Sequence, residues 1–154
     1  MRTVDARVMA APPERVFRHA SRVELWPRIL PHYRWVRLHD PRPDGGRLVE
    51  MAAYRPFGVF NWPTWWESEM EVDEERREVR YRHVRGVTRG MDVLWTIEPH
   101  PAGTSVTIVH DWKGPRWPLI GPWAADFVIG PLFVSGIASR TLQGIARAAE
   151  ASDA

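Results

Sequence analysis

The order of the expected elements constrains the fold of this chain more than any other feature. Residues 2–9 alternate in polarity, with Val4, Ala6 and Val8 on one face, which predicts a half-buried strand. Two helical segments follow, residues 33–113 then have strand character, and one long helix comes last. This order is typical of an α+β domain in which an antiparallel sheet meets a terminal helix.

The two early helices are marked by prolines. Residues 11–14, Ala-Pro-Pro-Glu, open the first helix, because proline is tolerated in a first helical turn and an acidic residue suits the positive end of the helix dipole. Ser21 is expected to cap a second helix over residues 23–30, with Pro27 in its first turn or at a bend. Pro31 ends that helix.

Six strands are expected after the helices, joined by turn residues such as those of 40–46 and 100–103. They are Tyr33–His39, Leu48–Tyr54, Trp65–Val72, Glu78–Arg85, Met91–Glu98 and Thr104–Lys113. Three glutamates at 67, 69 and 71 share one face and lie opposite arginines of the next strand, which predicts a solvated outer face. The apolar connection 55–63 either borders a cavity mouth or packs against a neighbouring loop.

The final helix is expected over Trp123–Ala151, with a kink or a break at Gly130-Pro131 because proline removes a helical hydrogen bond. Apolar residues recur at helical spacing beyond it and form a stripe that a sheet can cover. Gly136 and Gly144 are unfavourable inside a helix. Their expected benefit is close approach to the sheet or room for a ligand.

Residues 11–17, Ala-Pro-Pro-Glu-Arg-Val-Phe, followed by Trp26-Pro27, resemble the opening of bacterial polyketide cyclase/dehydrase and coenzyme Q-binding proteins. These are branches of the START-like, or SRPBCC (helix-grip), superfamily, and the resemblance covers nearly the whole chain. It implies a β-α-α-β(5–6)-α order, with a curved antiparallel sheet wrapped around a long, kinked C-terminal helix. It also implies a pocket between sheet and helix for a polyketide, a quinone or a lipid-like molecule.

Nine tryptophans are many for a chain of 154 residues, and several fall on inward strand faces. The rings either wall a cavity or simply fill the core. Given the resemblance, we expect a ligand to contact Tyr54, Trp66, Ser68, Met70, Tyr81, His83, Trp95, His110, Trp112, Phe127, Ile137 and Thr141.

Three of these residues are candidates for acid or base catalysis, namely His83, His110 and Tyr81. The alternative is that the histidines are hydrogen-bonded core residues. Residues 66–69 and 91–92 resemble the aromatase/cyclase branch, which folds and dehydrates a poly-keto chain. That branch commonly has a pocket arginine where this chain has Met70. The cyclase is therefore the alternative to simple binding, with Arg85 or Arg89 as substitutes for the missing arginine.

Composition excludes several other functions. The chain has no cysteine, which rules out disulfides and thiol chemistry. A net charge of +2 without a basic tract argues against nucleic acid as a partner. Neither a phosphate loop, a nucleophile elbow nor an HExxH motif occurs, so no cofactor and no metal site are expected.

No repeat or linker divides residues 1–154, which are expected to form one domain. The amino-terminal residues lack the apolar core of a signal peptide, and we expect a cytoplasmic protein. Residues 117–134 are apolar but interrupted by proline and glycine, which makes them a poor membrane span. Three roles stay open for this segment: it caps the cavity, it touches a membrane surface, or it forms a homodimer contact.

Overall fold

The computed structural model describes residues 1–57, 60–86, 88–114 and 134–151. Within these residues seven strands form one antiparallel sheet in the order β1-β7-β6-β5-β4-β3-β2. The strands are β1 (Arg2–Met9), β2 (Tyr33–Leu38), β3 (Arg47–Phe57), β4 (Phe60–Asp73), β5 (Glu78–Gly86), β6 (Asp92–His100) and β7 (Gly103–Asp111). The helices are α1 (Pro13–Ser21), the 3-10 helix η1 (Val23–Leu25), α2 (Trp26–Ile29) and α4 (Ser135–Ala151).

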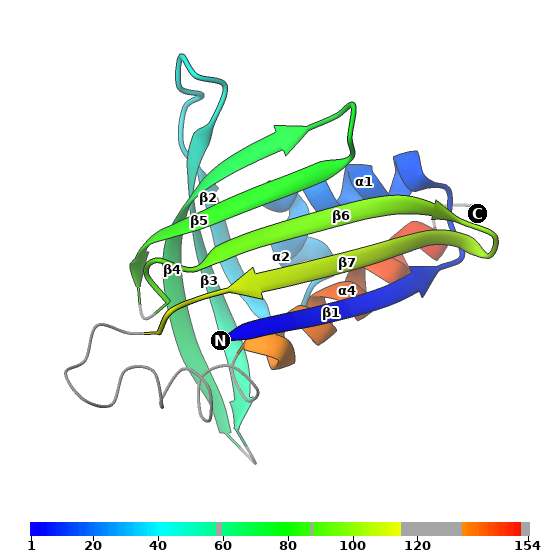
Figure 1. The fold of residues 1–154 in the computed structure, drawn as a ribbon. Coiled ribbons are helices and arrows are strands. Elements are labelled where there is room, and N and C mark those ends of the chain that lie inside the picture. Colours follow the sequence, from blue (N-terminus) through cyan, green and yellow to red (C-terminus); the bar gives the residue numbers. More distant parts are fainter. Residues whose placement is uncertain (58–59, 87, 115–133, 152–154) are drawn as a thin grey trace.

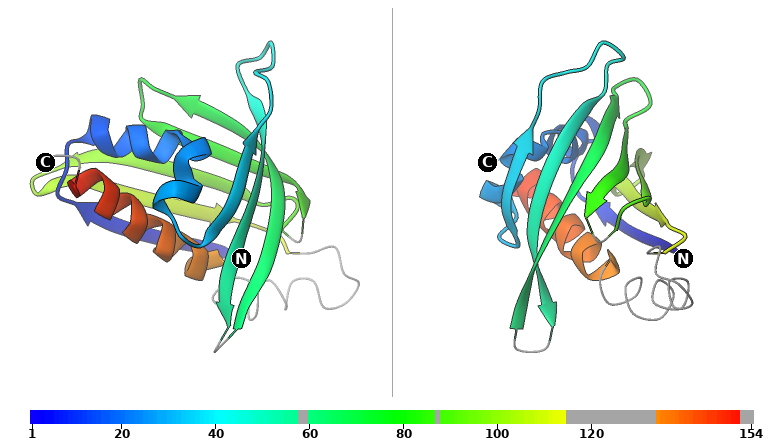
Figure 2. Two further views of the ribbon diagram at one scale, coloured as in Figure 1. Left: turned by 180° about the vertical axis from the view of Figure 1, so that it is seen from behind. Right: turned by 90° about the vertical axis from the view of Figure 1, so that its left-hand side faces the viewer.

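The sheet is curved, and its helices lie on the concave face (Figure 1 and Figure 2). The long helix α4 runs along this face, and α1 and α2 lie beside it. The predicted helix-grip order is therefore confirmed, with six strands after the helix pair. The core lies between the concave face and the three helices, because both contribute buried apolar side chains.

The junction between the first two helices differs from the prediction. Ser21 is the last residue of α1, and Arg22 rather than Ser21 precedes η1, without a side-chain cap. The expectation that Ser21 caps the second helix was therefore wrong, because Ser21 still belongs to α1 and the Arg22 N–H donates to the Arg18 carbonyl. Pro27 does lie in the first turn of α2, where its missing N–H costs nothing.

Strand β1 buries its polar face rather than its apolar one. Val4 and Val8 are 60% and 45% exposed, whereas Thr3 and Asp5 on the other face are half-buried. Ser135 at the start of α4 donates a hydrogen bond to the Asp5 carboxylate at 3.3 Å. This polar partner on α4 only partly offsets the burial of Asp5, because burial still raises the pKa of its carboxyl group. The register sets Asp5 opposite the buried Ile108 of β7, and alternation then turns the valines outward.

Residues 55–63 continue two strands instead of forming a loop. Strands β3 and β4 pair without a register shift from Arg47 opposite Met70 to Phe57 opposite Phe60. This hairpin extends past the neighbouring strands (Figure 1). The expectation of an apolar connection at 55–63 was wrong because the backbone groups there are used in strand pairing. The tip, residues 58–59, lies outside the described residues.

The two glycines of α4 have different surroundings. A Cβ atom on Gly144 would collide with Cδ2 of the buried Leu30, directly after α2, whereas a Cβ on Gly136 would meet nothing within 4 Å. The expected close approach therefore occurs at Gly144, although its close neighbour is Leu30, directly after α2, and not the sheet. Gly136 is not among the described residues that line the cavity, so room for a ligand there stays a prediction. The predicted kink at Gly130-Pro131 lies outside the described residues.

The convex face carries the charged side chains. Glu69 lies opposite Arg82, and Glu71 lies opposite Arg80, as the alternation predicts. Glu67 lies opposite Arg85 on the same face but is buried, so the prediction of a solvated face was wrong for this glutamate. Arg42 adds a hydrogen bond from its guanidinium to Glu69 at 3.3 Å. Among the described residues, no helix has the length and apolar character needed to cross a bilayer.

Candidate ligand-binding site

A cavity of about 70 Å³ lies between the concave face of the sheet and α4. Large side chains wall it on the sheet side, and α4 with the residue before it closes the other side through Val134, Ile137, Ala138 and Thr141. The sheet contributes because inward positions recur at every second residue of β3, β5, β6 and β7. Both the sheet and α4 therefore contribute to the cavity wall.

Aromatic rings hold one side of the wall together. Trp26 of α2 makes an edge contact with Tyr33, with ring centres 5.1 Å apart, and lies 5.6 Å from the ring of Trp95. Its indole N–H donates to the carbonyl of His19 at 2.9 Å. Trp26 is thus fixed at both ends, and Tyr33 continues the cluster to Trp66 at 6.1 Å.

His83 of β5 is fixed between a ring and a hydroxyl. The Trp66 indole stacks on its imidazole, with ring planes 6° from parallel. The Thr88 hydroxyl lies 2.6 Å from His83 Nδ1, a short hydrogen bond that fixes the orientation of the ring. Thr88 also lines the cavity but was not among the predicted site residues, because it belongs to a turn and has no strand periodicity.

Both cavity histidines are neutral at physiological pH. Burial lowers the pKa of His83 from 6.5 to about 3, with the nearby His110 as a second cause, and burial lowers the pKa of His110 to about 4. Both residues keep some accessible surface, and both line the cavity. A neutral imidazole offers one donor and one acceptor to a ligand.

Two polar atoms at the cavity have no hydrogen-bond partner among the described residues. They are the Tyr81 hydroxyl and His110 Nδ1, and both residues line the cavity. Burial also raises the pKa of Tyr81 well above 10, so the phenol keeps its proton. An unpaired buried polar atom costs about 1–3 kcal/mol, which a ligand oxygen or nitrogen would recover.

A third buried histidine, His32, does not line the cavity but contacts Thr141, which does, and it was missed by the sequence reasoning. His32 Nε2 lies 3.0 Å from the Thr141 hydroxyl, which in turn donates to the Ile137 carbonyl at 2.8 Å. Burial lowers the pKa of His32 to about 4, with Arg140 as a second cause. A histidine between Pro31 and a strand has no periodic signal, so the residues alone did not identify it.

Seven of the twelve predicted contact residues line the cavity. These are Trp66, Tyr81, His83, Trp95, His110, Ile137 and Thr141. The inward alternation of β4, β5, β6 and β7 predicted the first five of these positions, and the helical stripe predicted the last two. The lining also includes residues that were not predicted, among them Trp26, Tyr33, Met51 and Ala138.

Four predicted residues lie elsewhere. Tyr54 is 40% exposed on the convex face beneath the Arg34 guanidinium, because Met51 and Ala53 take the inward positions of β3. Met70 and Ser68 are buried in the core away from the cavity. Trp112 is buried by the turn after β5, where its indole N–H donates to the Arg89 carbonyl at 2.9 Å.

The remaining predicted contact, Phe127, lies outside the described residues, as does most of the apolar segment 117–134. The cap, membrane and homodimer roles of that segment stay predictions.

No arginine lines the cavity within the described residues. Arg85, one of the two expected substitutes for an arginine at Met70, lies on the convex face above the Trp65 ring. Arg89 is exposed in the turn that ends with Gly90. The cavity therefore offers neutral imidazole, phenol and hydroxyl groups, without a cation from these residues.

Two larger hollows lie on the convex side, with volumes of about 420 and 550 Å³. Their walls are mostly charged, including Glu71 and Arg80 in both. Charged walls remain solvated and have little attraction for an apolar molecule. The smaller inner cavity is the better candidate for a hydrophobic ligand.

Comparison with known proteins agrees with this architecture. The sequence profile of the family described as polyketide cyclase / dehydrase and lipid transport matches residues 9–131. No functionally curated protein matches the sequence.

Solved structures share the fold at low sequence identity. The protein TTHA0849 from Thermus thermophilus is 21% identical, with a TM-score of 0.80 over 100% of both chains. The Zhui aromatase/cyclase from Streptomyces sp. R1128 is 19% identical, with a TM-score of 0.77 over 97% of this chain and 93% of that one. A START superfamily protein from Mycobacterium smegmatis is 17% identical, with a TM-score of 0.67 over 98% and 95%.

Proposed function

The chain belongs to the polyketide cyclase / dehydrase and lipid transport family, and on that premise we propose that it binds a hydrophobic small molecule in the cavity against α4. The ligand class is a ring-containing, oxygen-bearing molecule such as a polyketide or a quinone, or a lipid-like chain with a polar end. Binding is non-covalent, through burial of apolar surface and a few hydrogen bonds.

One observation carries this proposal. The apolar wall formed by Trp66, Trp95 and their neighbours contains the Tyr81 hydroxyl and His110 Nδ1, which lack partners among the described residues. A ligand with carbonyl or hydroxyl oxygens would satisfy them while its carbon framework lies against the rings. Polar groups that fix orientation within an apolar wall are typical of small-molecule sites.

The cavity is smaller than the ligand class requires. Pockets for drug-sized ligands measure about 300–1,000 Å³, whereas this one measures about 70 Å³. A ring system therefore displaces side chains on entering. Ile137 is only half-buried, and Gly136 beside it has open space around it, so the first turns of α4 have room for such a movement.

The test is a binding titration of the intact protein with an anthraquinone and with the dye anilinonaphthalene sulfonate, joined to native mass spectrometry after gentle purification. Ala138→Phe places a ring in the cavity and is expected to weaken binding at least tenfold. Ala6→Phe, on the exposed face of β1, is the matched control and leaves affinity unchanged. No retained ligand and no uptake of either probe would contradict the proposal.

A second candidate, a polyketide aromatase/cyclase or dehydratase, is favoured by the two neutral histidines. A neutral imidazole of His83 or His110 removes a proton from a carbon between two carbonyls, and the protonated imidazole or the Tyr81 phenol then protonates the departing hydroxyl. The absence of an arginine from the described cavity wall weakens this candidate, because no cation there stabilises a developing enolate.

Turnover of a poly-keto substrate separates the two candidates. Loss of turnover in His83→Gln and His110→Gln, with binding retained, would favour the enzyme. Unchanged conversion in both variants and in Tyr81→Phe would exclude these residues as the acid or base, and no conversion by the unsubstituted protein would leave binding as the function.

A further inference from the structure

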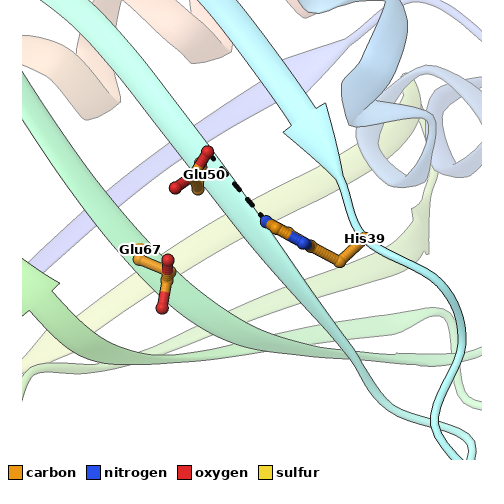
Figure 3. Close-up of side chains that lie close together, drawn as sticks. All are labelled: His39, Glu50 and Glu67. Atoms are coloured by element: carbon orange, nitrogen blue, oxygen red, sulfur yellow. Dashed lines mark ion pairs between the residues drawn. The ribbon is translucent and has the colours of Figure 1, made fainter.

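Three metal-ligating side chains meet on the convex face, behind the cavity wall. His39 follows β2, Glu50 is in β3 and Glu67 is in β4, so each comes from a different neighbouring part of the sheet (Figure 3). One ligand atom from each side chain lies within 4.8 Å of the other two. Within the described residues this group stands apart from the cavity.

The sheet register makes the group a consequence of the fold. Glu50 lies directly opposite Glu67 in the β3–β4 pair. The His39 backbone N–H donates to the Leu48 carbonyl at 3.0 Å, which holds the histidine beside β3. Its imidazole Nε2 lies 4.0 Å from the Glu50 carboxylate and points toward it (Figure 3).

The two carboxylates are an unfavourable pair by themselves. Like charges directly opposite on paired strands destabilise a sheet. The Glu50 and Glu67 side chains are only 19% and 12% exposed, so water screens their repulsion less than at an open surface. A cation between them would relieve this repulsion.

The nearby arginines do not form direct hydrogen bonds with these two carboxylates. Arg37 lies 4.0 Å from Glu50, and Arg85 lies 3.9 Å from Glu67, each measured from Nη1 to the nearer carboxylate oxygen. Charge-assisted hydrogen bonds are about 2.7–2.9 Å long, and Arg80 reaches Glu78 at 2.8 Å in this molecule. Within the described residues the carboxylate lone pairs of Glu50 and Glu67 thus remain free of direct hydrogen bonds.

We propose that His39, Glu50 and Glu67 bind a divalent transition-metal cation of the zinc class. One imidazole nitrogen and two carboxylate oxygens form a three-ligand set that leaves a position for water. Metal bonds of about 2.0–2.2 Å require the ligand atoms to approach closer than 4.8 Å. His39 is half-exposed and turns freely enough to close that gap.

The imidazole sets the preference among cations. Nitrogen ligands favour zinc and its transition-metal neighbours, whereas magnesium and calcium prefer oxygen ligands and higher coordination numbers. A bound ion would join β3 and β4 at the residues next to Met51 and Trp66, which line the cavity on the other face. The site therefore stiffens the cavity wall from outside and takes no part in chemistry within it.

Sequence spacing did not reveal this site. The ligands stand at positions 39, 50 and 67 and come together only through the pairing of three strands. Short metal motifs arise on one helix or one loop, and none occurs here.

The test uses untagged protein freed of metal with a chelator and titrated calorimetrically with zinc, then with cobalt(II) to record its absorption spectrum. We expect one equivalent of zinc, an intensified visible cobalt spectrum and a raised melting temperature. Magnesium is expected to bind at least tenfold more weakly. His39→Gln, Glu50→Gln and Glu67→Gln should each weaken zinc binding at least tenfold.

His100→Gln and Glu98→Gln are the matched controls, because both residues are exposed on the turn side of β6. Neither should alter zinc affinity. The proposal is overturned by the absence of a one-equivalent zinc isotherm, or by His39→Gln binding zinc as the unsubstituted protein does. His39 is exposed enough for its substitution to leave the fold intact, so this variant decides the matter even where a glutamate variant fails to fold.

Discussion

The indole of Trp66 stacks on the imidazole of His83, with ring centres 5.9 Å apart and planes 6° from parallel. The two residues come from adjacent strands, and a bulge between Glu67 and Ser68 shifts the register between them. This shift brings the rings face to face at the cavity wall. The register shift between β4 and β5 therefore helps to determine the shape of the cavity wall that Trp66 and His83 form.

Replacing Trp66 by leucine is expected to lower the free energy of unfolding by about 2–4 kcal/mol, because the indole is buried and its removal leaves a hole. Urea unfolding measures the loss. Trp35→Leu is the control, since Trp35 is half-exposed on the convex face beneath Arg37. Its cost is expected to stay below about 1 kcal/mol. Equal losses at both positions would contradict the assigned packing.

The protein is expected to lose stability as the pH falls below about 6.5. His32, His83 and His110 have folded pKa values of about 4, 3 and 4, against about 6.5 in the unfolded chain. Between these values the unfolded chain takes up protons that the folded chain does not. Each histidine therefore lowers the free energy of unfolding by up to about 1.4 kcal/mol per pH unit, and the loss levels off below the folded pKa.

Chemical unfolding between pH 7 and pH 4 measures this dependence. His110→Gln should reduce the number of protons taken up on unfolding by about one, and so lower the slope of the free energy of unfolding against pH, because it removes one of the three histidines. His100→Gln, in an exposed turn, controls for the loss of a histidine as such. A slope that is the same with and without His110 would mean that this ring is solvated in the folded protein.

The fold was predictable because local signals agreed with one another. The Ala-Pro-Pro-Glu opening, the alternating strands and the helical stripe all favoured one antiparallel sheet against a terminal helix, and the structure has that arrangement. The strand faces of 66–83 were also correct, since alternation fixes them once the strand is recognised. These features depend only on neighbours within the chain.

The errors occurred where a distant partner decided the outcome. β1 turns its valines to solvent because its register with β7 sets Asp5 and Arg7 opposite the buried Ile108 and Val106. Tyr54 lies outside because Met51 and Ala53 take the inward positions of β3. His32 was missed because its partner Thr141 stands on another element. Such contacts follow from tertiary packing, which the polarity pattern does not encode.

Alanine at Gly144 is expected to destabilise the protein by about 1–3 kcal/mol, although alanine is the better helix former. Its Cβ would collide with Cδ2 of Leu30, which is fully buried and would have to shift within the core to make room. Gly136→Ala in the same helix is the matched control. It should stabilise by about 0.4–1 kcal/mol, because nothing lies within 4 Å of the new methyl group. Thermal unfolding of both variants tests the opposite signs.

The contact between the new methyl group and Leu30 can be tested by itself. In a Gly144→Ala, Leu30→Val double variant the smaller valine makes room for the methyl group. The combined cost should therefore be less than the sum of the single costs. Additive costs would show that Leu30 is not what opposes the methyl group.

Removal of the Tyr81 hydroxyl tests whether this group binds a ligand or only supports the fold. Its hydroxyl is buried with no partner among the described residues, so Tyr81→Phe removes a polar atom that destabilises the empty protein. We expect this variant to unfold at the same or a slightly higher urea concentration. Affinity for an anthraquinone should nevertheless fall about threefold to tenfold, because one hydrogen bond to the ligand is lost.

Tyr33→Phe provides the contrast, because burial raises the pKa of Tyr33 and the nearby Thr141 side chain opposes that rise, which places a polar partner beside the Tyr33 hydroxyl. Its removal should cost about 0.5–1.5 kcal/mol of stability. A tyrosine kept for packing alone would show no change in affinity when its hydroxyl is removed. Unaltered anthraquinone binding by Tyr81→Phe would therefore show that the hydroxyl does not contact the ligand. A gain in stability together with a loss of affinity would show that the hydroxyl forms its hydrogen bond with the ligand.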